Sequence, residues 1–374
     1  MKSVFKIVWA VGILCISCAT VLYLMKKAEL AEPFLIASLI TIAIGVRGIK
    51  ALKGFAYPVM IFGVVSTALI FPQYLIEING FQLSLLITPL IQLIMFGMGT
   101  TMSFKDFVGI FKAPKGVFIG VISHFIIMPL LGFALANLSS FPPEIAAGMI
   151  LIGCSPNGVA SNVISYLAKA NLALSITITA ISTLMAPFVT PLLMKVLAGS
   201  FIEIDVLDMM WDIIKMVIIP IGLALVVNEF FSKKAKWLEI VMPYVSMFGI
   251  AFIIIIVTAL GRDSLLTVGP LLILLMLFHN LMGYTLGYWS ARLFKMSERD
   301  CRTVAIEVGM QNAGLAKGLA YGMGKLGTVG LAPMVFGPLM NITGSILASY
   351  WHRRPPRGEA GDETELLPEA IPAK

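Results

Sequence analysis

Charged side chains are scarce in this sequence: Asp, Glu, Lys and Arg together make up 13% of its 374 residues. A soluble globular domain carries about 25% charged residues, so the composition excludes an ordinary soluble enzyme. Hydrophobic residues make up 59% and the mean hydropathy is +0.95, an excess that extends along the whole chain. One or two anchoring helices on a soluble domain would not raise the mean so far. The sequence therefore predicts an integral membrane protein whose main solvent is the lipid bilayer.

Cysteine is also rare. The four cysteines, Cys15, Cys18, Cys154 and Cys301, lie in or next to apolar stretches and lack the paired spacing of an extracellular disulfide framework. The net charge of +7 does not indicate a nucleic-acid partner, because the basic residues lie between apolar segments instead of on one soluble face. We therefore expect the cysteines to be packing residues and the protein not to bind nucleic acid. We also expect the chain to be a monomer in the bilayer.

Long apolar runs fill the sequence. At roughly 20 residues per transmembrane helix, breaks at charge clusters and Pro/Gly turns predict about twelve spans, all helical, because an open sheet leaves its backbone unpaired in lipid. They lie near residues 5–25, 33–49, 56–76, 83–103, 116–138, 143–168, 172–198, 209–231, 240–260, 266–294, 300–321 and 326–351. Residues 352–374 are rich in Arg, Pro, Glu and Gly, which predicts a disordered cytoplasmic tail.

The positions of Lys and Arg predict the orientation. Most of the 27 basic residues fall on the side of the N-terminus, whereas Glu77, Glu144 and Glu203 fall in the opposite loops. Short loops rich in Lys and Arg stay in the cytoplasm. We therefore expect a multi-pass protein of the bacterial inner membrane with both termini in the cytoplasm.

A first polar segment, from Gly153 to Asn162, interrupts the predicted span 143–168. Pro156 has no amide hydrogen to donate and Gly158 permits positive φ, so we expect the helix to break here. A break frees backbone amides and carbonyls at membrane depth, and Ser161 and Asn162 add neutral oxygens.

A second polar segment, from Glu307 to Gly314, interrupts the predicted span 300–321. Glu307 is a carboxylate among apolar neighbours, and a buried charge in a membrane is expensive enough to indicate function. Broken helices with acid, amide and hydroxyl groups near the midplane are what a cation and substrate site in a secondary transporter requires. This pattern predicts such a site between the two segments.

Each of these features also has a purely structural explanation. Ser175, Thr179 and Thr183 recur every four residues on one helix face, yet such hydroxyls often bond their own i−4 carbonyls. Glu307 is alternatively the partner of a buried lysine, Lys215 or Lys317. The coincidence of two breaks, a carboxylate and a hydroxyl stripe favours a functional site.

The order of the spans also predicts an architecture. Without the first two spans, the breaks fall in the fourth helix of the first five and in the fourth of the second five. An odd number of spans per half inverts the second half relative to the first. This arrangement is typical of an inverted-repeat transporter with its site at the repeat interface.

The chain resembles the bile acid:sodium symporter family from about residue 56 to 351. The resemblance is carried by the runs 153–162, 165–169, 173–175, 182–187 and 307–312, and by Phe96-Gly97-Met98-Gly99 and His279-Asn280. It implies an all-α unit of ten helices (5+5, residues 55–351) with interleaved panel and core domains and two crossed, discontinuous helices. Residues 1–54 would then form two extra N-terminal helices packed beside the panel domain.

The resemblance also implies two sodium sites. One would use Ser161, Asn162, Ser175, Thr179 and Glu307. The other would use Glu307, Val308, Met310 and Gln311, the apolar residues through their carbonyls. Bacterial relatives usually place a Gln ligand of the second sodium where this chain has His124, so a neutral His ligand, a proton at this residue and a His bonded within the core all stay open. The expected cargo is one or two sodium ions.

Lys317 is a further departure, because relatives usually carry a small residue there. It would either attract the carboxylate of a substrate or pair with an outside acid. The helix starts after the two breaks direct partial positive charge into the cavity, which favours an organic anion bound near Asn157, Gly158, Asn312 and Gly314.

The sequence thus predicts sodium-coupled import of an organic anion, bile-acid-like or another small carboxylate. Two sodium ions with one carboxylate would move a net positive charge inward, favoured by about 2.3 kcal/mol per 100 mV. Proton-coupled transport or efflux of an anion is the alternative. An intramembrane enzyme is disfavoured, because Asp205 and Asp208 lie in a predicted outside loop and the chain has three His.

Overall fold

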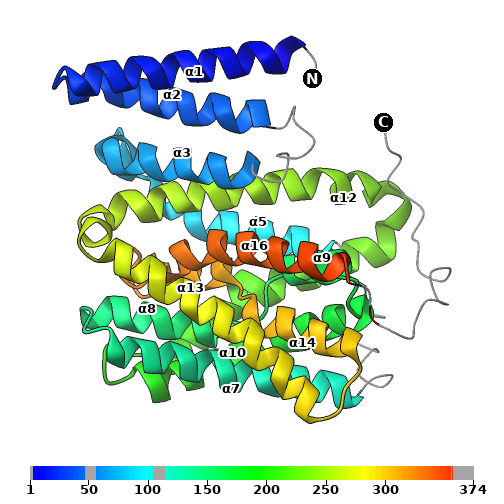
Figure 1. Cartoon of the computed structure of the whole chain (residues 1–374). Helices are drawn as coiled ribbons and strands as arrows, with labels where there is room; N and C mark the ends of the chain where they lie inside the picture. Colours follow the sequence, from blue (N-terminus) through cyan, green and yellow to red (C-terminus); the bar gives the residue numbers. More distant parts are fainter. Residues whose placement is uncertain (1–2, 47–55, 101, 104–113, 355, 357–374) are drawn as a thin grey trace.

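The computed structural model describes residues 3–46, 56–100, 102–103, 114–354 and 356. Within them the chain is almost entirely helical (Figure 1). The one small sheet among these residues pairs β1 (Glu77–Ile78) with antiparallel β2 (Phe81–Gln82). Its turn residues, Asn79 and Gly80, have φ of 52° and 82°, which is the backbone that two-residue hairpins favour.

The described helices follow one another along the chain. In order, they are α1 (Ser3–Leu24), α2 (Ala28–Val46), α3 (Ala56–Ile70), α4 (Gln73–Ile76), η2 (Leu83–Leu86), α5 (Ile87–Gly99), α7 (Pro114–Leu138), α8 (Pro143–Cys154), α9 (Ala160–Leu167), α10 (Leu172–Ala198), α11 (Val206–Ile213), the π-helical η3 (Ile214–Ile218), α12 (Ile219–Leu260), α13 (Arg262–Leu293), α14 (Glu298–Gly309), α15 (Ala313–Gly322) and α16 (Leu331–His352).

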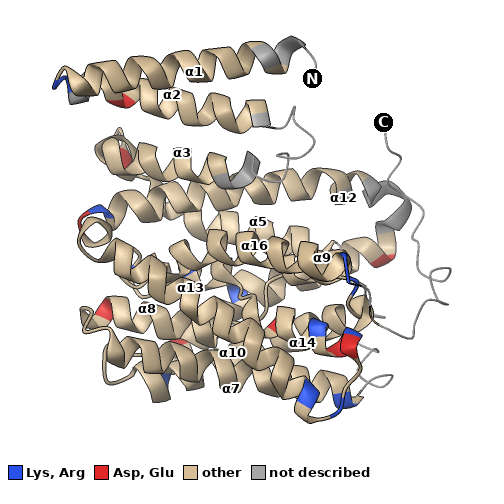
Figure 2. Ribbon diagram, viewed as in Figure 1, with Lys and Arg blue, Asp and Glu red and all other residues tan. Residues whose placement is uncertain are grey.

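Seven helical segments of the described chain are long and apolar enough to cross a membrane. They are Ile7–Leu24, Pro114–Leu138, Leu172–Ala198, Val206–Phe230, Ile240–Leu260, Arg262–Leu293 and Leu331–His352. Shorter apolar helices lie at Leu30–Gly45, Val59–Ile70, Leu83–Gly99 and Pro143–Cys154. Most charged residues lie near helix ends (Figure 2). The chain is therefore a multi-pass helical membrane protein, while the number of twelve spans stays a prediction.

One expected gap between spans is not a break in the helix. The expected spans at 209–231 and 240–260 agree with the candidate membrane segments Val206–Phe230 and Ile240–Leu260, but α12 runs without interruption from Ile219 to Leu260. Residues 231–242 contain no Gly or Pro and several good helix formers, so nothing in the backbone ends the helix there. The basic residues in this stretch separate two apolar segments without separating two helices. The predicted tail lies largely outside the described residues.

The helices stack in layers from α1 at one edge to α7 and α10 at the other (Figure 1). In the N-terminal part, α1 packs on α2, α2 on α3, and α3 on α12, which also packs along α5. On the opposite side α7, α8, α10, α13, α14 and α16 surround the two polar segments. A Cβ on Gly153 of α8 would lie 2.4 Å from the Met128 carbonyl oxygen of α7. A residue without a side chain is therefore what lets these helices approach so closely.

Candidate functional site

The first predicted break is present. Helix α8 ends at Cys154 and α9 begins at Ala160, so five residues of non-helical backbone lie between them. Pro156 cannot continue the helical hydrogen bonds. A Cβ on Gly158 would lie 2.7 Å from the Gln311 carbonyl oxygen, so this glycine allows the second polar segment to lie directly against the first.

The second predicted break is also present, and it pairs with the first. Helix α14 ends at Gly309, and α15 begins at Ala313 with the Asn312 side chain accepting a hydrogen bond from the Leu315 amide at 3.0 Å. The Asn312 amide donates to the Pro156 carbonyl at 2.7 Å, and the Gly158 amide donates to the Met310 carbonyl at 3.3 Å. The two segments thus satisfy each other's freed backbone groups in a short antiparallel bridge.

A buried group of oxygens surrounds the carboxylate of Glu307. Ser175 donates to Glu307 Oε1 at 2.5 Å and Thr179 donates to Oε2 at 2.9 Å. Asn162 Oδ1 accepts from Ser175 at 2.9 Å, and the hydroxyls of Ser161 and Thr179 lie 3.3 Å apart. We call these five residues the Glu307 cluster. The sequence predicted this set, and the structure brings all five together from α9, α10 and α14.

The chemistry of the Glu307 cluster suits a small, hard cation. Its polar atoms are carboxylate, amide and hydroxyl oxygens, the ligand type that hard cations prefer. Glu307 is fully buried, and its carboxylate is bonded by hydroxyls without a lysine partner among the described residues. Lys215, one suggested partner, instead pairs with Asp212 at 2.8 Å. Thr183, the third hydroxyl of the predicted stripe, lies outside the cluster, with its buried hydroxyl unpartnered.

Side-chain amides cap the carbonyls at the C-terminal end of α14. Asn157 donates to the Glu307 carbonyl, Gln311 donates to the Val308 carbonyl at 2.8 Å, and Asn280 donates to the Gly309 carbonyl at 2.8 Å. These are carbonyls that a helix leaves without partners at its end. The predicted second set of ligands, Glu307, Val308, Met310 and Gln311, therefore lies together, and its carbonyls accept hydrogen bonds from the protein.

His124 of α7 lies beside this group. Its Nε2 is 2.9 Å from the Ser155 carbonyl oxygen and its Nδ1 is 3.0 Å from Asn157 Nδ2. A carbonyl only accepts, so Nε2 carries the hydrogen, and an amide NH₂ only donates, so Nδ1 accepts. The same NH₂ bonds the Glu307 carbonyl, which fixes the orientation of the Asn157 amide. The ring is therefore neutral in this arrangement, with both nitrogens bonded.

A cavity of about 670 Å³ opens beside the break. Its polar side chains belong to Asn162, Tyr166, Ser246, Gln311, Asn312, Lys317 and Asn341; Gly158 and Gly314 also line it, and the rest of the lining is mainly apolar. Three of the four residues expected near a substrate line this cavity. Asn157 does not: its side chain is fully buried and turned toward His124 and Glu307.

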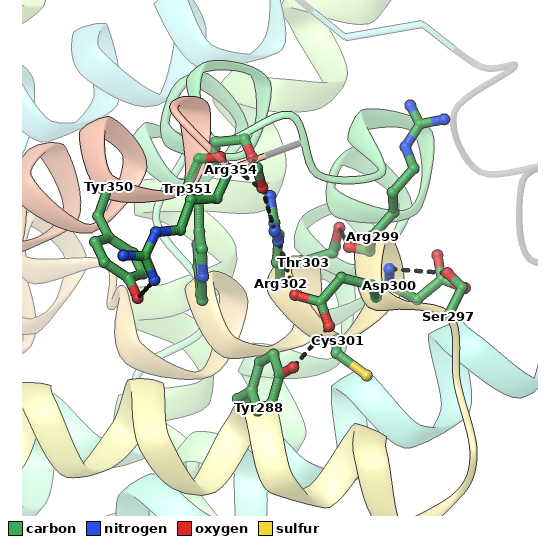
Figure 3. A network of polar contacts seen from close by, with 12 residues as sticks. Tyr288, Ser297, Arg299, Asp300, Cys301, Arg302, Thr303, Tyr350, Trp351 and Arg354 are labelled. Carbon is green, nitrogen blue, oxygen red and sulfur yellow. Dashed lines mark hydrogen bonds and ion pairs between the residues drawn. The ribbon is translucent and has the colours of Figure 1, made fainter. Parts of the chain in front are cut away.

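Two structural groups were not among the predicted site residues. Asn280, which caps α14, also accepts from Thr343 at 2.5 Å and so ties α13 to α16. The sequence feature that could have indicated Asn280 is a polar amide within an apolar run. Arg302 forms the centre of a second network (Figure 3). It donates to Glu298 at 3.0 Å and to main-chain carbonyls of α16 and of the turns after α9 and α16, and it stacks on Trp351.

The fold and the site define a class: a helical membrane transporter. Comparison with known proteins gives the family. A family model described as the sodium bile acid symporter family matches residues 88–268. A Bacillus subtilis (strain 168) protein, named as the uncharacterized sodium-dependent transporter YocS, is 39% identical over 314 residues, which cover 84% of this chain and 95% of that protein.

More distant relatives are also named as sodium cotransporters. An Arabidopsis thaliana protein, named as the probable chloroplastic sodium/metabolite cotransporter BASS1, is 34% identical over 263 residues, 70% of this chain and 66% of its own length. The ileal sodium/bile acid cotransporter of Oryctolagus cuniculus is 34% identical over 239 residues, 62% of this chain and 68% of its own. The chain belongs to the sodium bile acid symporter family, and sodium-coupled transport is the activity that its relatives are named for.

Proposed function

We propose that this protein is a secondary transporter that imports an organic anion together with sodium by alternating access. The observation that carries the proposal is the Glu307 cluster, a buried set of oxygens with one formal negative charge at the crossing of two broken helices. In the proposal, residues 55–351 form a ten-helix unit of panel and core domains, and both termini lie in the cytoplasm of a bacterial inner membrane.

The Glu307 cluster would hold sodium as a transported ion. Two hydroxyl hydrogens point at the carboxylate. Sodium would turn these hydroxyls so that their oxygen lone pairs face the ion, and the carboxylate would supply the countercharge. The ion would thus tie α9, α10 and α14 together, which supports an ordered crossing region in the loaded protein.

The anion would bind in the 670 Å³ cavity near Gly158, Asn312 and Gly314. Helices α9 and α15 begin at this cavity, and the partial positive charge of a helix N-terminus favours an anion. Asn162 belongs to both parts: its Oδ1 accepts from Ser175 in the cluster, and the residue also lines the cavity. Sodium that orders Asn162 would therefore prepare the cavity for the anion.

The experiment that tests the ion site is sodium-dependent thermal stability of the purified protein. We expect sodium, at matched ionic strength in potassium, to raise the melting temperature of the parent. Glu307→Gln, which keeps the shape and removes the charge, should lose this effect. Glu203→Gln is the matched control, because Glu203 is exposed in a loop. Equal stabilisation of the parent and Glu307→Gln would contradict the assignment.

A further inference from the structure

Lys317 is a buried cation beside the cavity. It lies in the second turn of α15, lines the cavity together with Asn312 and Gly314, and is 2% exposed. The ion pairs of the described chain are Lys215 with Asp212, Arg262 with Asp263, Arg302 with Glu298 and Lys325 with Glu144. None of them includes Lys317, so the predicted pairing with an outside acid does not occur among these residues.

We propose that Lys317 binds the carboxylate of an amphipathic monoanion in this cavity. The proposal rests on the proposed function, since it takes the cavity to be the substrate site. A buried charge is stable only when it is paired. Two acids of the described chain already have other partners: Glu307 accepts from Ser175 and Thr179, and Asp212 pairs with Lys215. A carboxylate on the substrate would complete the pair.

The lining of the cavity defines the rest of the substrate. Apart from its few polar groups, it is built mainly from aliphatic side chains and six methionines, Met95, Met98, Met102, Met242, Met247 and Met340. Unbranched, polarisable methionines adapt to apolar ligands of irregular shape. One lysine in a mainly apolar cavity matches one acid group on an apolar body, and it disfavours dianions and compact polar acids.

Cholate and its neutral methyl ester are the probes, because they share a body and differ in charge. We expect the parent to bind cholate about thirtyfold or more tightly than the ester. Lys317→Met should lose this preference, and Lys317→Arg should retain part of it. Lys195→Met is the matched control, because Lys195 is exposed in α10. Sodium stabilisation of the Lys317→Met protein reports separately on the Glu307 cluster.

These measurements separate the two proposals. If sodium does not raise the melting temperature of the parent, the proposed function is contradicted. Intact sodium stabilisation with equal binding of cholate and its ester by the parent would overturn the role of Lys317 alone, as would an unchanged preference in Lys317→Met. If Lys317→Met does not fold, the comparison of cholate with its methyl ester in the parent still tests whether the cavity prefers a carboxylate.

Discussion

Asn162 Oδ1 lies 2.9 Å from the hydroxyl of Ser175, while Asn162 also lines the cavity beside the break. A single side chain therefore belongs to the proposed sodium site and to the proposed substrate site. Two ligands influence each other's binding only through differences in free energy between states of the protein. An amide held by the ion and exposed to the substrate provides such a contact without a long pathway.

The first prediction concerns this coupling. Asn162→Ala should reduce the factor by which sodium raises cholate affinity, because the shared side chain is lost. Isothermal titration with and without sodium gives the coupling factor directly. Asn137→Ala is the control, since Asn137 is exposed and bonds a carbonyl of its own helix; an unchanged coupling factor in Asn162→Ala would contradict this role.

The second prediction concerns the hydroxyl ligands. Thr179→Val keeps the shape of a buried side chain and removes the hydroxyl that bonds Glu307 at 2.9 Å. We expect the sodium concentration for half-maximal stabilisation to rise about tenfold, which corresponds to the roughly 1.4 kcal/mol of one good polar contact. Thr258→Val is the control, because the Thr258 hydroxyl bonds the Ile254 carbonyl within α12. The same sodium titration curve for Thr179→Val and the parent would rule out this ligand.

The third prediction concerns the crossing of the two polar segments. A Cβ at residue 158 would lie 2.7 Å from the Gln311 carbonyl oxygen, and this contact is backbone that cannot rotate away. Gly158→Ala should therefore lose about 1–3 kcal/mol of stability and most of its transport. At Gly222 of α12 an added Cβ meets no atom within 4 Å, so Gly222→Ala should be neutral or slightly stabilising. Thermal melts of the two variants side by side make the comparison; equal melting temperatures would contradict it.

The fourth prediction concerns the Arg302 network (Figure 3). Arg302 is 4% exposed, and its guanidinium bonds Glu298 and the carbonyls of Ala168, Trp351 and Arg354. Arg302→Met would leave these acceptors without a donor, so we expect a loss of about 3–5 kcal/mol in stability. Sodium affinity should stay unchanged, since Arg302 makes no contact in the Glu307 cluster.

The control for that prediction is Arg353→Met, because Arg353 is exposed at the end of α16. Arg353→Met should have the same melting temperature as the parent. A weakened sodium response in Arg302→Met protein that still melts cooperatively would show that the network acts on the ion site as well as on stability.

The residues that lie together around Glu307 could be predicted more fully than the ends of the helices. Proline and glycine residues such as Pro156 and Gly309 weaken a helix locally, so both breaks could be placed from residue type, whereas the contact of Gly158 with Gln311 needed the structure. The Glu307 cluster followed from the cost of polar groups in lipid together with the family resemblance. The continuity of α12 could not be predicted, because Lys and Glu end an apolar span but are good helix formers.

The contacts of individual polar residues could also be determined only from the structure. Asn157 was expected at the substrate, whereas its amide lies between His124 and the Glu307 carbonyl. Lys317 had two open interpretations, and the choice depends on which acids lie near it in space. Such contacts join residues more than 100 positions apart in the chain, as Asn157 and Glu307 are, and no local pattern records them.

Sodium-coupled import can be tested by the accumulation of cholate in proteoliposomes under an inward sodium gradient. We expect uptake above the equilibrium level in the parent, collapse of that uptake when a sodium ionophore dissipates the gradient, and none above equilibrium in Glu307→Gln. Equal accumulation by the parent and Glu307→Gln, or accumulation by the parent without sodium, would contradict it.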